Sequence, residues 1–153
     1  MAFETLLPVV LLLSAGLFAA WRGGPPEKMG ALIIAALLFT DIVYHWRFGP
    51  SGFMEVDPFH LVMDAAELAA IWALALQANR IWPLWAAAAQ LICVAGHVAA
   101  LIEPGGMTGA YWTMTQVPFF IQVTALLLGT AFHARRELRI GRYRSWRPVR
   151  SVA

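Results

Sequence analysis

Charged residues and cysteines are scarce in this chain of 153 residues. Only 13% of the residues are charged, whereas a soluble domain of this size has roughly a quarter. Hydrophobic residues make up 60% of the chain, and the mean hydropathy is +0.66. The single cysteine, Cys93, excludes an intramolecular disulfide and a metal site built from several cysteines. These shortages argue against a soluble or disulfide-stabilised domain and favour one domain that lies in a membrane.

Five apolar runs follow one another along the chain, separated by connections that are rich in Gly and Pro. Each run has about 17–23 residues, a length that suits a hydrocarbon core about 30 Å thick. The first run follows the acidic segment MAFE, which favours a membrane span over a signal peptide. We therefore predict an all-α integral membrane protein, a bundle of five transmembrane helices. The expected spans are residues 5–21, 29–48, 58–78, 81–102 and 112–134.

Basic residues are distributed unevenly between the two ends of this expected bundle. Ten of the eleven lie in the first and third connections or after the last span, and only Arg47 lies at the other end. The positive-inside rule therefore predicts an external N-terminus and a cytoplasmic C-terminus. The excess of Arg over Lys suggests a bacterial source, so we expect a multi-pass protein of a bacterial inner membrane.

The last span is followed by a strongly basic segment. We predict residues 1–138 to form the transmembrane domain and residues 139–153 to form a basic cytoplasmic tail. Ile140, Tyr143 and Trp146 lie among the arginines of this tail. That mixture favours anionic membrane lipids, rather than nucleic acid, as the partner of the tail.

Polar side chains occur inside the expected spans, where charge is costly. With a rise of about 1.5 Å per residue, Asp41 lies roughly 10 Å, Asp64 about 9 Å and His97 about 8 Å from the outer ends of their spans. A carboxylate that faces lipid costs about 2.5–3.5 kcal/mol, so these groups should face the bundle interior. The expected layer consists of Asp41, His45, His60, Asp64, Glu67, Gln90 and His97. No comparable layer is expected in the inner half, and His133 is interpreted as an interfacial residue.

Helical spacing places several of these residues on shared faces. Asp41 and His45 are four residues apart, so their side chains can meet. The other sets on one face are His60, Asp64 and Glu67, at i, i+4 and i+7, and Gln90 and His97, which are seven apart. Such groups can hold helices together, but a convergent intramembrane set favours a functional site.

Four stretches of the chain carry a resemblance to a known family. They are WRGGPPEKMGALIIAALLFTDIVYHWRF, DPFHLVMDAAELAAIW, QLICVAGHVAALIE and AYWTMTQVPFF, within about residues 15–138. They resemble the emopamil-binding protein family, membrane sterol isomerases and relatives that share the EXPERA domain. Asp41 stands at the family's histidine position and His45 at its glutamate position, so that their order is reversed. Asp64 replaces a family Glu, and Phe119 stands at the position of an amide, with Gln116 and Gln122 nearby.

This resemblance implies a membrane-embedded isomerase of a sterol-like or other polycyclic lipophilic substrate. A proton would add to a ring double bond, a carbocation would form, and a neighbouring carbon would lose a proton, without any cofactor or metal. The pair Asp41 and His45 would hold the proton donor, and Asp64 would accept the outgoing proton. The residues expected to contact the substrate are His60, Glu67, Gln90, His97, Trp112, Gln116 and Phe119, with cation–π stabilisation from the aromatic rings.

Two other functions remain open. The same histidines and carboxylates suit a one- or two-metal centre like those of helix bundles. Alternatively, His97 and either His45 or His60 could bracket a b-type haem. The other function is that of a non-catalytic membrane subunit that binds a lipophilic ligand. Assembly as a homodimer is also left open.

Overall fold

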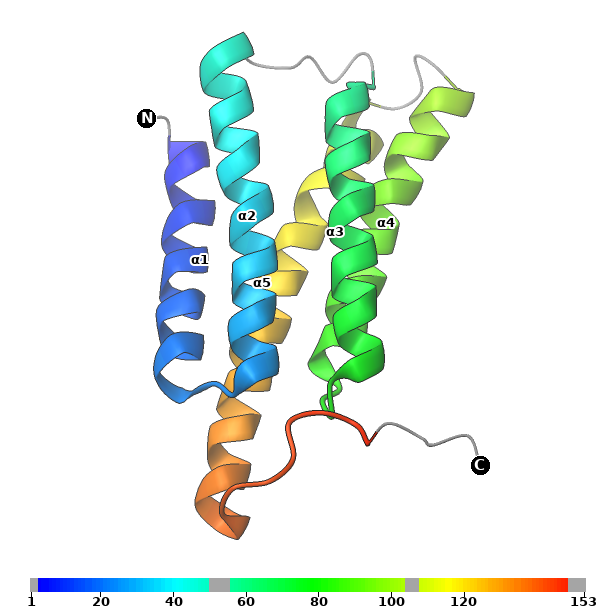
Figure 1. Ribbon diagram of the computed structural model, residues 1–153. Helices are drawn as coiled ribbons and strands as arrows, with labels where there is room; N and C mark the ends of the chain where they lie inside the picture. The colour runs from blue at the N-terminus through cyan, green and yellow to red at the C-terminus, as the bar shows by residue number, and fades with distance from the viewer. Residues whose placement is uncertain (1–2, 50–55, 104–107, 149–153) are drawn as a thin grey trace, which may run out of the picture.

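A computed structural model describes residues 3–49, 56–103 and 108–148. These residues form five helices and no β-strand, as Figure 1 shows. The helices are α1 (Phe3–Arg22), α2 (Pro25–Phe48), α3 (Pro58–Gln77), α4 (Trp82–Ile102) and α5 (Thr108–Ile140). By length and composition, α2, α3, α4 and α5 could each cross a membrane, while the described apolar part of α1, Leu6–Arg22, is shorter. The all-α prediction is confirmed, and the four long apolar helices indicate a multi-pass membrane protein.

Proline residues mark the first turns of three helices. The helices α2, α3 and α4 each carry proline at the first or second position, where the missing N–H has no helical partner to lose. Asp57 caps α3, because its Oδ1 accepts a hydrogen bond of 2.9 Å from the Phe59 N–H. The α3–α4 connection has four residues, 78–81, rather than the two expected between the third and fourth spans. The start of α2 lies four residues before its expected position, and α5 continues past residue 134 to Ile140.

The helices run up and down the bundle, and α5 crosses it obliquely (Figure 1). We call the end where α2 finishes and α3 begins the upper end; the α1–α2 and α3–α4 connections lie at the lower end. Figure 1 shows α5 extending beyond the other helices at the lower end. It packs against α4, α1 and α2. Three alanines of α4, at 86, 87 and 89, are buried and allow close helix approach.

Trp82 is the central side chain of the lower half. Its indole, only 4% exposed, lies between Gly30 of α2 and Gly129 of α5. A Cβ atom on either glycine would collide with the indole ring. The two glycines therefore let α2 and α5 approach α4 around a large buried aromatic.

The chain after α5 returns to the α3–α4 connection. The Asn79 N–H donates to the Ser145 carbonyl over 2.9 Å, and the Arg147 N–H donates to the Gln77 carbonyl over 2.8 Å. Trp146 packs against the buried core. The described part of the predicted tail is therefore held against the lower end of the bundle, as the red segment of Figure 1 shows.

Candidate functional site

The first polar network lies near the upper end, between α2 and α3. His60 Nε2 is 3.0 Å from Asp41 Oδ1, and His45 Nε2 is 3.4 Å from the same oxygen. On the other side of its ring, His60 Nδ1 is 3.2 Å from Asp57 Oδ2, which also accepts a hydrogen bond of 2.7 Å from the Tyr44 hydroxyl. We call these five residues the Asp41 network. The predicted pair of Asp41 and His45 is thus present, but His60 lies closer to the carboxylate.

The Asp41 network contains more acceptors than two neutral imidazoles can serve. Both imidazole rings face Asp41 through their Nε2 atoms. On the other side of the rings, His60 Nδ1 faces Asp57, and His45 Nδ1 lies 3.0 Å from the Gly49 carbonyl. A carbonyl or an ionised carboxylate only accepts. His60, which has a carboxylate oxygen within 3.2 Å of each ring nitrogen, therefore needs a proton on both nitrogens, a protonated carboxyl partner, or a cation shared with Asp41. The network therefore has a place for a mobile proton or a bound cation.

The second polar network lies among α3, α4 and α5. His97 Nε2 is 2.8 Å from Asp64 Oδ2, and the Gln90 amide donates to Asp64 Oδ1 over 2.9 Å. The Tyr111 hydroxyl lies 2.9 Å from His97 Nδ1. The Gln122 amide donates to Gln90 Oε1 over 2.8 Å. We call these residues the Asp64 network.

One assignment of protons satisfies each of these contacts in the Asp64 network. With His97 neutral and protonated on Nε2, it donates to Asp64 and accepts from the Tyr111 hydroxyl. Asp64 then accepts from both His97 and Gln90, as a carboxylate anion can. The Asp64 side chain is 13% exposed and that of His97 only 3%. In this assignment the largely buried network carries one negative charge, on Asp64.

His60, Asp64 and Glu67 lie along one face of α3, and this face connects the two networks. His60 belongs to the first and Asp64 to the second, and one helical turn separates them. Glu67, the third residue on this face, is 4% exposed. Neither of its oxygens has a hydrogen-bond partner of good geometry within the described residues, although the Gln122 side chain lies beside it. A buried carboxyl without a well-formed hydrogen bond is costly, so Glu67 is the member of the predicted site whose presence packing does not explain.

The three remaining predicted residues lie on α5, outside both networks. Trp112 is 49% exposed, and Gln116 is also exposed. Phe119 packs against the buried core and meets Phe120 edge to face. The buried amide of α5 is instead that of Gln122. Gln122, like Gln116, lies near Phe119, which occupies the position of the family's amide. Spacing alone could not choose between them, because the choice depends on where α4 packs.

Among the described residues, two groups of side chains could hold a metal ion. The potential ligand atoms of Asp41, His45 and His60 lie within 4.8 Å of one another, as do those of Asp64, Cys93 and His97. The first group is half-exposed, whereas Cys93 and His97 are buried. A haem between two histidines fits less well: His45 and His60 stack with ring centroids 5.1 Å apart, and both nitrogens of His97 are engaged.

A third polar cluster lies at the lower end of the bundle, at the start of α2 and in the α3–α4 connection. Glu27, fully buried, accepts hydrogen bonds from the Gly24 N–H, Arg80 Nε and Trp82 Nε1 over 2.9, 2.8 and 3.2 Å. Because the expected span began at residue 29, Glu27 was assigned to a connection. Its position at the third residue of α2, after two prolines, was the signal that could have identified it.

His133 belongs to this lower cluster and is buried in the protein, with 7% of its surface exposed. Arg80 Nη2 lies 3.1 Å from His133 Nδ1, and the Tyr143 hydroxyl lies 2.9 Å from the same nitrogen. An arginine can only donate, so His133 Nδ1 is an acceptor. Burial raises the pKa of Tyr143, although the guanidinium groups of Arg80 and Arg136 lower it. The phenol therefore stays protonated at neutral pH and can donate to the imidazole.

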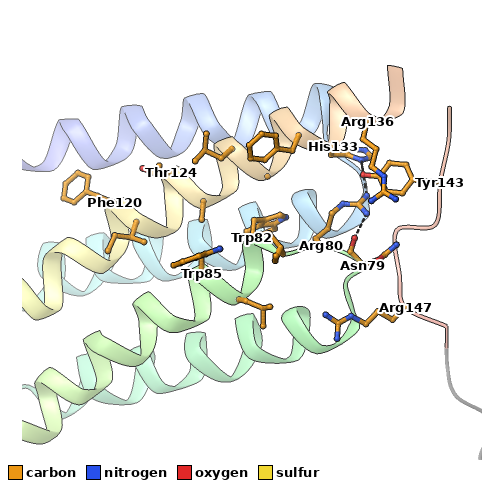
Figure 2. A pocket seen from close by; sticks show the side chains of 17 residues that line it. Asn79, Arg80, Trp82, Trp85, Phe120, Thr124, His133, Arg136, Tyr143 and Arg147 are labelled. Carbon is orange, nitrogen blue, oxygen red and sulfur yellow. Dashed lines mark hydrogen bonds between the residues drawn. The ribbon is translucent and has the colours of Figure 1, made fainter. Parts of the chain in front are cut away.

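A cleft of about 830 Å³ opens between α4 and α5 beside this cluster (Figure 2). Arg80, Trp82 and His133 line it, and none of the predicted site residues does. Comparison of the chain with protein-family models, curated proteins and solved structures finds no match. Function must therefore be inferred from the polar networks and this cleft.

Proposed function

We propose that the chain crosses a bacterial inner membrane five times, with its N-terminus outside and its C-terminus in the cytoplasm. The support is the charge at the two ends of the bundle. Arg22, Lys28 and Arg80 lie at the lower end, together with the basic residues after α5, whereas Arg47 lies at the upper end.

Labelling of introduced cysteines tests this orientation. Cysteine would be placed at position 51, between α2 and α3, or at position 151, after α5, in a Cys93→Ala background. An impermeant thiol reagent added outside intact cells should label position 51 only. Labelling of both positions from outside would contradict the five-span topology.

For the upper half of the bundle, we propose acid–base isomerisation of a sterol-like or other polycyclic lipophilic substrate. The Asp41 network donates a proton to one carbon of a ring double bond, and the π electrons form the new C–H bond. Asp64 stabilises the resulting carbocation and accepts a proton from a neighbouring carbon. The electrons of that C–H bond form the new double bond, so the molecular formula is unchanged and no cofactor is consumed.

The observation that supports this proposal is that the two networks need different numbers of protons to satisfy their contacts. The Asp41 network must hold an additional proton or cation, whereas the Asp64 network is satisfied with one carboxylate anion. They lie one helical turn apart on α3, which places an acid beside a base. This pairing, together with the resemblance to the emopamil-binding protein family, supports double-bond isomerisation over simple binding.

Uptake of deuterium from heavy water tests the reaction. Purified protein would be incubated with a trial sterol or terpenoid that has a ring double bond, followed by mass spectrometry. The wild-type chain should incorporate deuterium, and Asp41→Asn and Asp64→Asn should each slow the uptake by about 100-fold or more. Glu137→Gln, a change on the exposed lower part of α5, is the control and should leave the rate unchanged. Equal rates in all four proteins would refute the acid–base proposal.

A metal centre is the second candidate, because one observation favours it specifically. The Nδ1 atoms of His45 and His60 are held by the Gly49 carbonyl and the Asp57 carboxylate, so both Nε2 atoms point at Asp41. Histidine ligands of zinc are commonly oriented in this way by a carbonyl or carboxylate on the other nitrogen. Three such ligands with an open side would suit a catalytic zinc ion.

Metal analysis separates the two candidates. Stoichiometric zinc or iron that is lost in His45→Ala and His60→Ala, but retained in His97→Ala, would establish the centre at the Asp41 network. Loss in His97→Ala alone would place it at Asp64, Cys93 and His97. A metal-free protein that still exchanges deuterium would support the proton-transfer function.

A further inference from the structure

The cleft between α4 and α5 has an apolar wall and a cationic end. Figure 2 shows Phe120 and Thr124 towards one end and Arg80, Arg136 and Arg147 around the other. Leu128 and Phe132 continue the apolar wall along α5, and Trp85 of α4 also lines the cleft. The lining thus changes along its length from apolar to strongly basic.

The apolar part has the length of one lipid chain in one leaflet. From Phe120 to Phe132 the rise along α5 is about 18 Å. Half of a hydrocarbon core about 30 Å thick is about 15 Å. The cationic end of the cleft would then lie at the level of the lipid headgroups.

Two of the three arginines at that end form no ion pair within the part of the chain that the structure describes. Arg80 is paired with Glu27 over 2.8 Å. Arg136 stacks on the Tyr143 ring at 4.3 Å, and Arg147 donates from Nε to the Ala78 carbonyl over 3.1 Å. Neither forms an ion pair with a carboxylate in the described residues, and no acidic side chain lines the cleft. Two guanidinium groups therefore remain for an anion.

The chain after α5 fixes one of these cations in place. Asn79 donates from its backbone N–H to Ser145 and from its side-chain amide to the Arg144 carbonyl over 2.9 and 3.1 Å. These bonds hold the returning segment against the α3–α4 connection, and Arg147 of this segment lines the cleft. A cation positioned in this way is part of a built site rather than of a freely moving basic arm.

We infer that this cleft binds one anionic glycerophospholipid, with its phosphate at the cationic end, which Arg136 and Arg147 line. One acyl chain would lie along Phe132, Leu128 and Phe120. Guanidinium groups bind phosphate oxygens through directed, charge-assisted hydrogen bonds. Two cations at the membrane surface should favour an anionic headgroup by about tenfold or more over a zwitterionic one. This inference is independent of the chemistry proposed for the upper half, because the two sites share no residue.

Lipid binding by the full-length protein in detergent tests the site. Phosphatidylglycerol and phosphatidylcholine with the same acyl chains would be titrated while thermal unfolding or native mass is measured. Phosphatidylglycerol should bind about tenfold more tightly, and the double variant Arg136→Gln, Arg147→Gln should lose that preference. The matched control is Arg135→Gln, Arg139→Gln, which removes two exposed charges of α5 outside the cleft and should keep the preference.

Two further measurements distinguish binding of the phosphate group from binding of the acyl chain. Inorganic phosphate alone should not stabilise the protein, and Thr124→Trp, which fills the apolar part, should weaken binding of both lipids. An equal loss in the two double variants would indicate diffuse surface attraction and refute the site. Equal affinity of the wild-type chain for the two lipids would refute it as well, as would stabilisation by inorganic phosphate to the same extent.

Discussion

Buried charge is arranged differently at the two ends of the bundle. At the lower end, Glu27 and Arg80 form a 2.8 Å ion pair whose side chains are 0% and 6% exposed. In the upper half, the charged partners are carboxylates and histidines, and Asp41 and His45 remain 40% and 34% exposed. An arginine keeps its proton under all ordinary conditions, whereas an imidazole gains and loses one near neutral pH.

From this difference we propose a structural role for the lower end and a chemical role for the upper half. The Glu27–Arg80 pair joins the start of α2 to the α3–α4 connection, and Trp82 covers it. The Asp41 and Asp64 networks instead place exchangeable protons side by side on α3. We therefore expect changes at the lower end to affect folding and changes in the upper half to affect proton transfer. Four substitutions test that division, in order of decreasing expected effect on stability.

Glu27→Ala should have the largest effect. It leaves Arg80 without its carboxylate and removes the acceptor of the Gly24 and Trp82 N–H groups. Breaking a buried pair in this way costs about 3–5 kcal/mol. The measurement is reversible unfolding of the purified protein in detergent. Arg22→Ala, an exposed cation at the same end, is the control, and similar stability of the two variants would contradict a structural role for Glu27.

Gly30→Ala should come next. The added methyl group would collide with the Trp82 indole, and such overpacking costs about 1–3 kcal/mol. Gly16→Ala, on α1, is the matched control, because a Cβ atom there has no neighbour within 4 Å. That control should stabilise the protein by about 0.5–1 kcal/mol through its helix preference. If both substitutions stabilise the protein, that result contradicts the close contact between Gly30 and the Trp82 indole.

Asp64→Asn should cost only about 1 kcal/mol of stability while abolishing proton transfer. The asparagine can still accept from the Gln90 amide, but it has lost the charge that faces His97. Unfolding and deuterium uptake would be measured on the same preparation. A loss of stability as large as that of Glu27→Ala would make Asp64 a structural residue.

Glu67→Leu should have the smallest effect on stability. Neither Glu67 oxygen has a hydrogen-bond partner of good geometry in the described residues, so an apolar side chain of similar size should change the free energy of unfolding by less than about 1 kcal/mol. Gln122→Leu is the control, because it removes a buried amide that donates to Gln90, and should cost about 1–3 kcal/mol. A larger loss in Glu67→Leu than in Gln122→Leu would contradict the expectation.

The sequence predicted the helices well because membrane helices have simple signals. Apolar runs of spanning length and prolines in the first turns placed α2, α3 and α4 within a few residues. The end of α5 was missed because residues 135–140 are mostly charged. Arg, Glu and Leu nevertheless favour helix, and these residues continue α5 past the apolar run.

The site was predicted less completely, because it depends on how the helices pack. Spacing correctly paired Asp41 with His45, but only the packing of α3 on α2 brings His60 still closer to Asp41. Similarly, α5 offers Gln116 and Gln122 on different faces, and its rotation against α4 selects Gln122. The buried pair of Glu27 and Arg80 joins residues 53 positions apart, which helical spacing cannot detect.

Binding of a hydrophobic amine tests the central claim most directly. Its ammonium group mimics the proposed carbocation and should be stabilised by Asp64. Calorimetry in detergent would compare the amine with a neutral polycycle of the same shape, for the wild-type chain and for Asp64→Asn. We predict that the wild-type chain prefers the amine by at least about tenfold, or about 1.4 kcal/mol, and that Asp64→Asn removes this preference while the neutral ligand binds as before. Equal binding of the two ligands by the wild-type chain, with no change in Asp64→Asn, would contradict the proposed acid–base site.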